Sequence, residues 1–158
     1  MDAERARRFL LTLPHAVETM QWGDNLVFWV GDKAIGGKMF ALVNLDQTSL
    51  NGSEHGVASY AAGPERFAEL VEREGLRPAP YMARIFWVAA ERWSALRDKE
   101  WEAELDAAHA MTLAKLPRRT REVLAMPDRE RAKLVAARRK VLVAQAAAKS
   151  KAKAANRK

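Results

Sequence analysis

The segment from Trp22 to Leu42 constrains the fold of this chain more than any other. It contains two short apolar stretches, residues 26–30 and 39–43, that are rich in β-branched and aromatic side chains. Between them stand Gly31-Asp32 and Gly36-Gly37, and glycines supply the positive-φ positions that a chain reversal needs. The segment therefore predicts a β-hairpin at the centre of a sheet.

The remaining pattern predicts helices before and after further strands. Ala6, Phe9, Leu10 and Leu13 have helical spacing ahead of Pro14. We then expect a strand at 17–21, a possible strand at 48–51 and a loop at 51–56. A helix should begin at Pro64 and stop at Glu74-Gly75. An extended connection at 76–83, a strand at 85–90 and a helix at 98–116 should follow. Local reversals imply antiparallel pairing, so we expect an α+β domain with helices packed on one face of a twisted sheet.

The C-terminal part has a different composition. Pro117 should break the long helix, residues 118–126 can form one or two turns, and Asp128 is expected to cap a new helix. We therefore divide the chain into a domain at 1–126 and a basic, helical or disordered arm at 127–158. Arg131 and Arg138 interrupt the arm's apolar arc, so we expect no tight docking on the domain, and disorder beyond Ala148.

The positive charge of the chain is concentrated in this arm. The whole sequence has 27 Lys and Arg against 20 Asp and Glu. Residues 128–158 hold 11 of these bases and 2 of the acids, which leaves 16 bases and 18 acids in residues 1–127. A nearly neutral body with a polybasic arm suggests binding to phosphates with release of counterions.

Several classes of site are excluded or disfavoured. The chain has no cysteine, so it can form neither disulfides nor thiolate metal sites. The three histidines are far apart, and the acidic residues Asp98, Glu102 and Asp106 fit a solvated helix face. The run 32–39 lacks the first glycine and the hydroxyl of a phosphate-binding loop. We expect no cofactor, no metal and no enzymatic activity.

The N-terminal residues are charged and no long apolar run is present. A soluble, cytoplasmic protein is therefore expected, with no membrane partner. No heptad pattern is visible, so a monomer is the default expectation.

Several short motifs resemble the MmcQ/YjbR family over residues 1–121. They are Trp22-Gly23, Gly-Gly-Lys-Met-Phe-Ala-Leu at 36–42, Tyr81, Trp87 and Lys-Leu-Pro-Arg at 115–118. The resemblance implies a frataxin-like fold and DNA binding by two hairpin-like wings, here around Lys33 and Lys38 and around 81–87. Frataxins carry an acidic ridge on the first helix, whereas this helix also has Arg5, Arg7 and Arg8, which argues against an iron role.

The sequence therefore predicts a DNA-binding protein that does not read base sequence, with RNA left open as a partner. The alternative is a protein-interaction or small-ligand module whose basic tail is incidental. Trp22 and Trp87 are interpreted as core anchors. The candidate nucleic-acid-binding residues are Lys33, Lys38, Arg84, Arg118, Arg119, Arg121, Lys133, Arg138, Arg139, Lys140, Lys149, Lys151 and Lys153.

Overall fold

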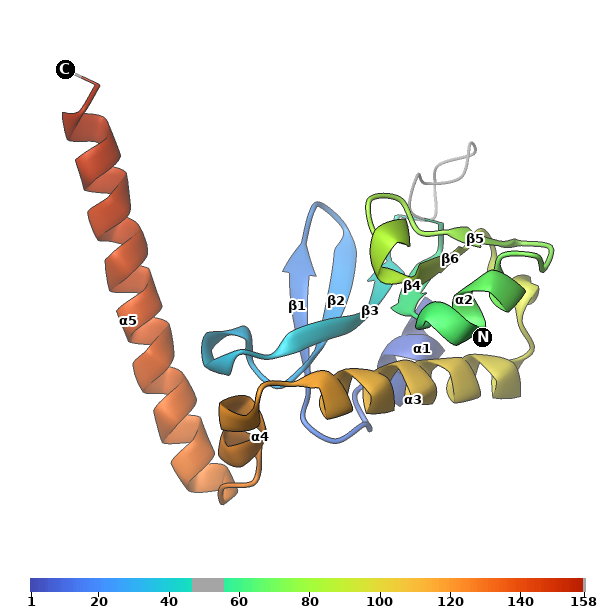
Figure 1. The fold of residues 1–158 in the computed structure, drawn as a ribbon, viewed down its shortest axis with the longest axis horizontal. Helices are drawn as coiled ribbons and strands as arrows, with labels where there is room; N and C mark the ends of the chain where they lie inside the picture. Colours follow the sequence, from blue (N-terminus) through green and yellow to red (C-terminus); the bar gives the residue numbers. More distant parts are fainter. Residues whose placement is uncertain (47–55, 158) are drawn as a thin grey trace.

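A computed structural model describes residues 1–46 and 56–157, and its centre is a six-stranded antiparallel sheet (Figure 1). The strand order is β1-β2-β3-β4-β6-β5. The strands are β1 (Ala16–Gln21), β2 (Asn25–Val30), β3 (Lys38–Asn44), β4 (Ala58–Ala61), β5 (Leu76–Pro78) and β6 (Trp87–Ala90). With its helices, the chain has the α+β class that the sequence predicts.

The predicted central hairpin is present as β2 and β3. A short 3-10 helix, η1 (Lys33–Ile35), joins the two strands. Gly31 and Gly36 have positive φ angles of 76° and 88°, as expected, but Gly37 does not. Gly37 is required for space instead, because a Cβ there would lie 1.9 Å from the Gly31 carbonyl oxygen.

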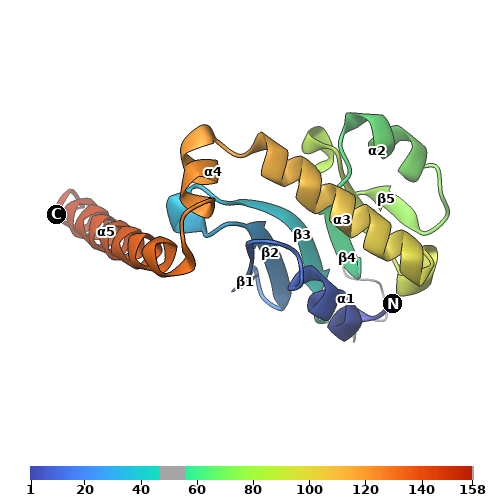
Figure 2. The same ribbon diagram turned by 90° about the horizontal axis from the view of Figure 1, so that it is seen from below.

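Helices α1 (Ala3–Leu10) and α3 (Asp98–Lys115) lie on the same side of the sheet, as predicted (Figure 2). Leu10 of α1 and Trp101 of α3 are fully buried. Trp101 meets Tyr60 of β4 edge-to-face with ring centroids 6.1 Å apart. Burial of such large apolar side chains between helix and sheet supplies most of the stability of this layer.

Several boundaries differ from the predictions. Residues 83–85 form the 3-10 helix η2 (Ala83–Ile85), and the following strand begins only at Trp87 because Phe86 has a φ of 61°. The supposed extended connection contributes β5, an edge strand that tolerates Pro78. Helix α2 (Pro64–Leu70) ends before the predicted stop, and a third 3-10 helix, η3 (Trp93–Ala95), precedes α3. The strand and loop predicted within 48–55 lie outside the described residues.

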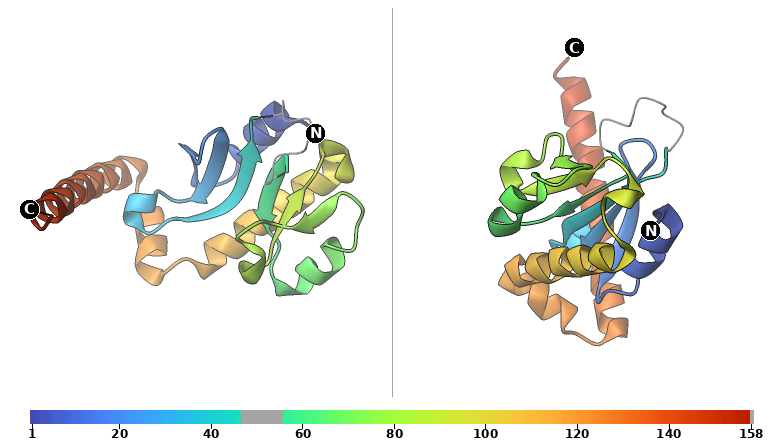
Figure 3. Two further views of the ribbon diagram at one scale, coloured as in Figure 1. Left: turned by 90° about the horizontal axis from the view of Figure 1, so that it is seen from above. Right: turned by 90° about the vertical axis from the view of Figure 1, so that its right-hand side faces the viewer.

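The C-terminal segment forms α4 (Arg118–Leu124) and the long α5 (Asp128–Ala155). Helix α5 projects from the end of the body away from the N-terminus (Figure 3). Two predictions are wrong here. The helix continues past Ala148 because alanine and lysine favour helix and no breaker intervenes. Pro127 rather than Asp128 is the N-cap, since Asp128 already has helical geometry.

No residue of α5 is buried, although the helix does contact η1. Within the described ranges, no helix is both long enough and apolar enough to cross a bilayer.

Candidate nucleic-acid interface

The side of the sheet away from α1 and α3 carries its own aromatic residues. Leu42, Ser59 and Ala89 are neighbours on three adjacent strands. They point to the face opposite Tyr60, which packs against α3. Trp29 and Trp87 line one groove together with Met39, so they belong to this face as well. We call this surface the open face of the sheet.

Three adjoining grooves follow the open face. The aromatic groove has a volume of about 430 Å³ and is lined by Trp22, Asn25, Met39, Leu42, Tyr81 and Met82. The lysine groove, of about 360 Å³, includes Trp22, Trp29, Lys33, Lys38, Met39 and Trp87. The helix groove, of about 610 Å³, includes Thr19, Trp29, Asp32, Lys33, Arg139 and Leu142.

Shared residues make the three grooves continuous. Trp22 and Met39 belong to both the aromatic and the lysine groove. Trp29 and Lys33 belong to both the lysine and the helix groove. A track therefore runs from Tyr81 across the open face to the middle of α5.

Two of the predicted cations meet in the lysine groove. Lys33 lies in η1, and its Nζ is 5.6 Å from the centre of the Trp29 ring, within cation–π range. Lys38 is exposed at the start of β3. Arg84 is exposed too, and its neighbour Ile85 lines the same groove. The two predicted wings thus border one groove.

The remaining predicted cations fall into two groups. Arg118, Arg119 and Arg121 are exposed on α4, where the Arg118 Nε donates to Glu122 at 2.8 Å. None of them lines the three grooves. The predicted cations of α5 are all exposed, and they are Lys133, Arg138, Arg139, Lys140, Lys149, Lys151 and Lys153. Of these, Arg139 forms an ion pair with Asp32 and lines the helix groove.

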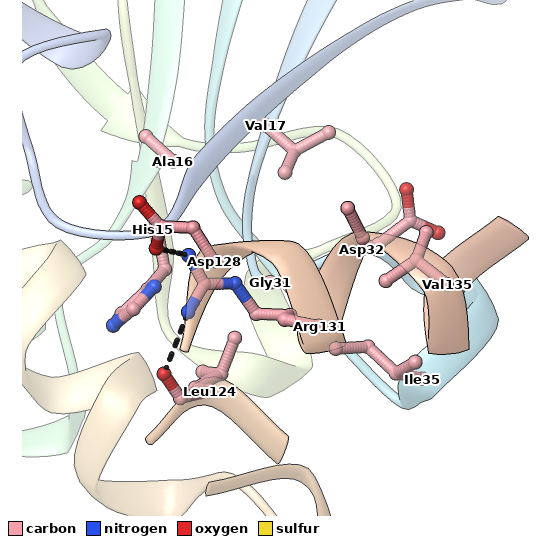
Figure 4. Close-up of a pocket in the computed structure, with 11 residues that line it drawn as sticks. His15, Ala16, Val17, Gly31, Asp32, Ile35, Leu124, Asp128, Arg131 and Val135 are labelled. Carbon is pink, nitrogen blue, oxygen red and sulfur yellow. Dashed lines mark hydrogen bonds and ion pairs between the residues drawn. The ribbon is translucent and has the colours of Figure 1, made fainter. Parts of the chain in front are cut away.

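A separate pocket lies where α5 leaves the body (Figure 4). Arg131 donates to the Leu124 carbonyl oxygen at 3.0 Å and to the Met126 carbonyl oxygen at 2.9 Å. It also pairs with Asp128 at 2.5 Å. Leu124 is the last residue of α4 and Met126 lies in the link to α5, so Arg131 both satisfies the end of α4 and fixes the start of α5.

The carboxylates that line this junction pocket already form ion pairs within the protein. These carboxylates, Asp32 and Asp128, are each paired with an arginine. The pKa of His15 is lowered by burial first, and then by the charges of Arg131 and His109. The pocket therefore serves as the anchor of α5. From the sequence, Arg131 was interpreted only as a cation that interrupts the apolar arc. Its position three residues after Asp128 was the available sign of an ion pair between them.

Some acidic residues of α3 form ion pairs, while Glu102 and Asp106 are exposed to solvent. Asp98 pairs with the Met1 amino group and with Arg5, while Glu104 pairs with Arg66. In the part of the chain that the structure describes, no three His, Asp or Glu side chains gather in a way that could hold a metal ion.

Trp22 corrects one prediction about the core. It is 63% exposed, whereas Trp87 is 3% exposed as expected of a core anchor. Trp22 lies in the turn between β1 and β2 with a φ of 49°, beyond the last strand pair, Gln21 and Asn25. Tyr81, a motif residue at the start of the second predicted wing, is 86% exposed and lines the aromatic groove together with Trp22.

The comparison with known families confirms the predicted family, although the motif at 115–118 lies outside the matched residues. The YjbR family model matches residues 11–111, which include both wings and exclude α4 and α5. No curated protein and no solved structure matches the sequence. Since the matched region is more than half of the chain, the protein belongs to the YjbR family.

Proposed function

We propose that this protein binds DNA without reading its base sequence, through the exposed cations of α5 and the lysine groove. The observation that carries the proposal is the continuous track between them, in which Lys33 belongs both to the lysine groove and to the groove beside α5. Among the described residues that line the three grooves, Asp32 is the one carboxylate, and it is paired with Arg139. The track therefore has a net positive charge, which favours contacts with phosphates.

Helix α5 supplies the longer-range attraction. Its 28 residues reach about 42 Å at 1.5 Å per residue, which exceeds one turn of duplex DNA. Arg131 and Arg139 hold the helix to the body, and the other cations project into solvent. If six to nine cations contact phosphates, log K should fall against log salt with a slope of about −5 to −8.

Charge-matched variants of the full chain test this proposal. One variant changes Arg138, Lys149, Lys151 and Lys153 to Gln and leaves both anchoring arginines in place. The control changes Arg8, Arg92, Lys99 and Lys115 to Gln, which removes four exposed cations outside the three grooves. Binding of labelled duplexes of two unrelated sequences is measured by anisotropy at several salt concentrations.

The α5 variant should bind both duplexes more weakly by the same factor, and its salt slope should become shallower by about 0.9 for each lost contact. The control variant should lose much less. Equal losses in the two variants would reject the assignment to α5. Absence of binding by the unmodified protein would reject DNA as the ligand and would favour the protein-interaction or small-ligand alternative.

We propose no catalytic step for this chain. The cytoplasmic location expected from the sequence is compatible with a nucleic-acid ligand.

A further inference from the structure

Two large aromatic side chains border one groove and remain in solvent. Trp22 comes from the β1–β2 turn and Tyr81 from the segment between β5 and η2, and they are 63% and 86% exposed. Met39 and Leu42 also line this aromatic groove. Exposed aromatics that converge from distant parts of a chain are typical of a recognition surface.

The backbone holds both aromatics in an uncommon conformation. Trp22 has a φ of 49° and Tyr81 a φ of 63°, values that are rare for bulky side chains. Such conformations persist where the surrounding structure imposes them, and they concentrate at binding sites. The hydrogen bond from the Asn25 Nδ2 to the Trp22 carbonyl oxygen, at 2.8 Å, fixes one of the two turns.

The polar surroundings favour a nitrogen-rich, negatively charged strand. Asn25 lines the groove and is 6% exposed, and its Oδ1 has no hydrogen-bond partner among the described residues. An N–H group of a ligand would satisfy that oxygen. Lys33 and Lys38 line the adjoining lysine groove, and no carboxylate of residues 1–46 or 56–157 lines either groove.

We propose that the aromatic groove binds bases of an unpaired nucleic-acid strand, stacked on both Trp22 and Tyr81, while Lys33 and Lys38 contact the phosphates of the strand. This inference rests on the proposed function and adds a preference to it. In a duplex both faces of every base are already stacked, so the aromatics can act only on a single strand. The cations of α5 would still attract either form of DNA.

The test compares single-stranded and duplex DNA. A labelled oligothymidine and a duplex of equal length are titrated with the full chain and with Trp22→Ala, Tyr81→Ala, Trp22→Phe and Tyr81→Phe. Leu11→Ala is the matched control, because Leu11, directly after α1, is 41% exposed and lines none of the three grooves. Thermal unfolding of each variant establishes that it is folded.

Each alanine variant should bind the oligothymidine about 5- to 100-fold more weakly, since stacking on an aromatic side chain contributes that much per base. The phenylalanine variants keep a stacking surface, so they should lose much less. Duplex binding should change little in all of them, and Leu11→Ala should behave as the unmodified protein.

The outcomes separate the two proposals. If the alanine variants bind the oligothymidine as well as the unmodified protein does, the stacking site is wrong while α5-dependent binding stands. If they lose single-strand and duplex affinity equally, the groove contributes no preference for unpaired strands and the inference is again wrong. If the unmodified protein binds neither DNA, both proposals fail.

Discussion

Gly37 illustrates at the scale of one residue how closely the backbone packs in the central hairpin. A Cβ at this position would lie 1.9 Å from the Gly31 carbonyl oxygen and 2.8 Å from that of Asp32, and both are backbone atoms. Gly23, in the β1–β2 turn, has a φ of 81°, and apart from its chain neighbours no atom of the described residues lies within 4 Å of the position of a Cβ. The first glycine is required for space, and the second only for its conformation.

Replacement of Gly37 or Gly23 by alanine should therefore lower the free energy of unfolding by different amounts. We expect Gly37→Ala to lower the free energy of unfolding by about 3 kcal/mol or more, because backbone atoms must move. Gly23→Ala should lower it by about 1 kcal/mol, the cost of a left-handed conformation with a side chain. Urea denaturation of both variants measures the difference. Equal losses would contradict the packing described for Gly31 and Gly37.

Single residues also show where sequence reasoning fails. Trp22 and Trp87 both stand beside apolar strand residues, yet one is 63% and the other 3% exposed. The difference depends on where the strand pair ends, and the local sequence does not contain that information. Arg131 and Arg138 occupy nearly the same position on a helical wheel, but Arg131 is the one that donates to the Leu124 and Met126 carbonyl oxygens.

At the scale of elements, α4 is joined to the hairpin by a buried hydrogen bond. The Thr120 Oγ1 donates to the Ile35 carbonyl oxygen at 2.8 Å, and Thr120 is 3% exposed. A Cβ on Gly36 would approach this hydroxyl to 2.6 Å, so the glycine makes room for the bond. Neither Thr120 nor Ile35 stands out in the sequence, because the hydrogen bond joins positions that are 85 residues apart.

Replacement of this threonine tests the bond. Thr120→Val keeps the shape but leaves the Ile35 carbonyl oxygen without its donor, so we expect a loss of about 1–3 kcal/mol in the free energy of unfolding. Thr120→Ser retains the hydroxyl and should lose less. Chemical denaturation measures both. A valine variant as stable as the original would mean that the hydroxyl contributes nothing.

Glu100, at the start of α3, should make the stability of the fold decrease at low pH. The Glu100 carboxylate accepts from the Arg97 backbone N–H at 2.9 Å and pairs with Arg73, and these contacts lower the pKa of Glu100 to about 2. An unfolded glutamate has a higher pKa, so this contribution is present above that value and is lost as the pH falls toward 2. Glu100→Gln should flatten the dependence of Tm on pH over this range. An unchanged profile would contradict the assignment.

For the whole molecule, the core and the track differ in how far the sequence predicts them. The core follows from local periodicity, so the antiparallel sheet and the helices on one side of it were predictable. The track combines the β1–β2 turn, the start of β3, the segment around Tyr81 and α5, which are distant in sequence. Its cations were predicted individually, but their neighbours depend on strand order and on the path of each loop.

Removal of α5 should leave the body folded. No residue of α5 belongs to the buried core, whose last member in sequence is Leu124. A chain of residues 1–126 should therefore unfold cooperatively, with a Tm within about 5 °C of the full chain, which corresponds to about 1–2 kcal/mol for a domain of this size. The small loss comes from the end of α4, which Arg131 caps. Arg131→Gln in the full chain should reproduce much of that loss. A broad transition, or loss of the far-UV circular dichroism of the sheet, would show instead that α5 is part of the folding unit.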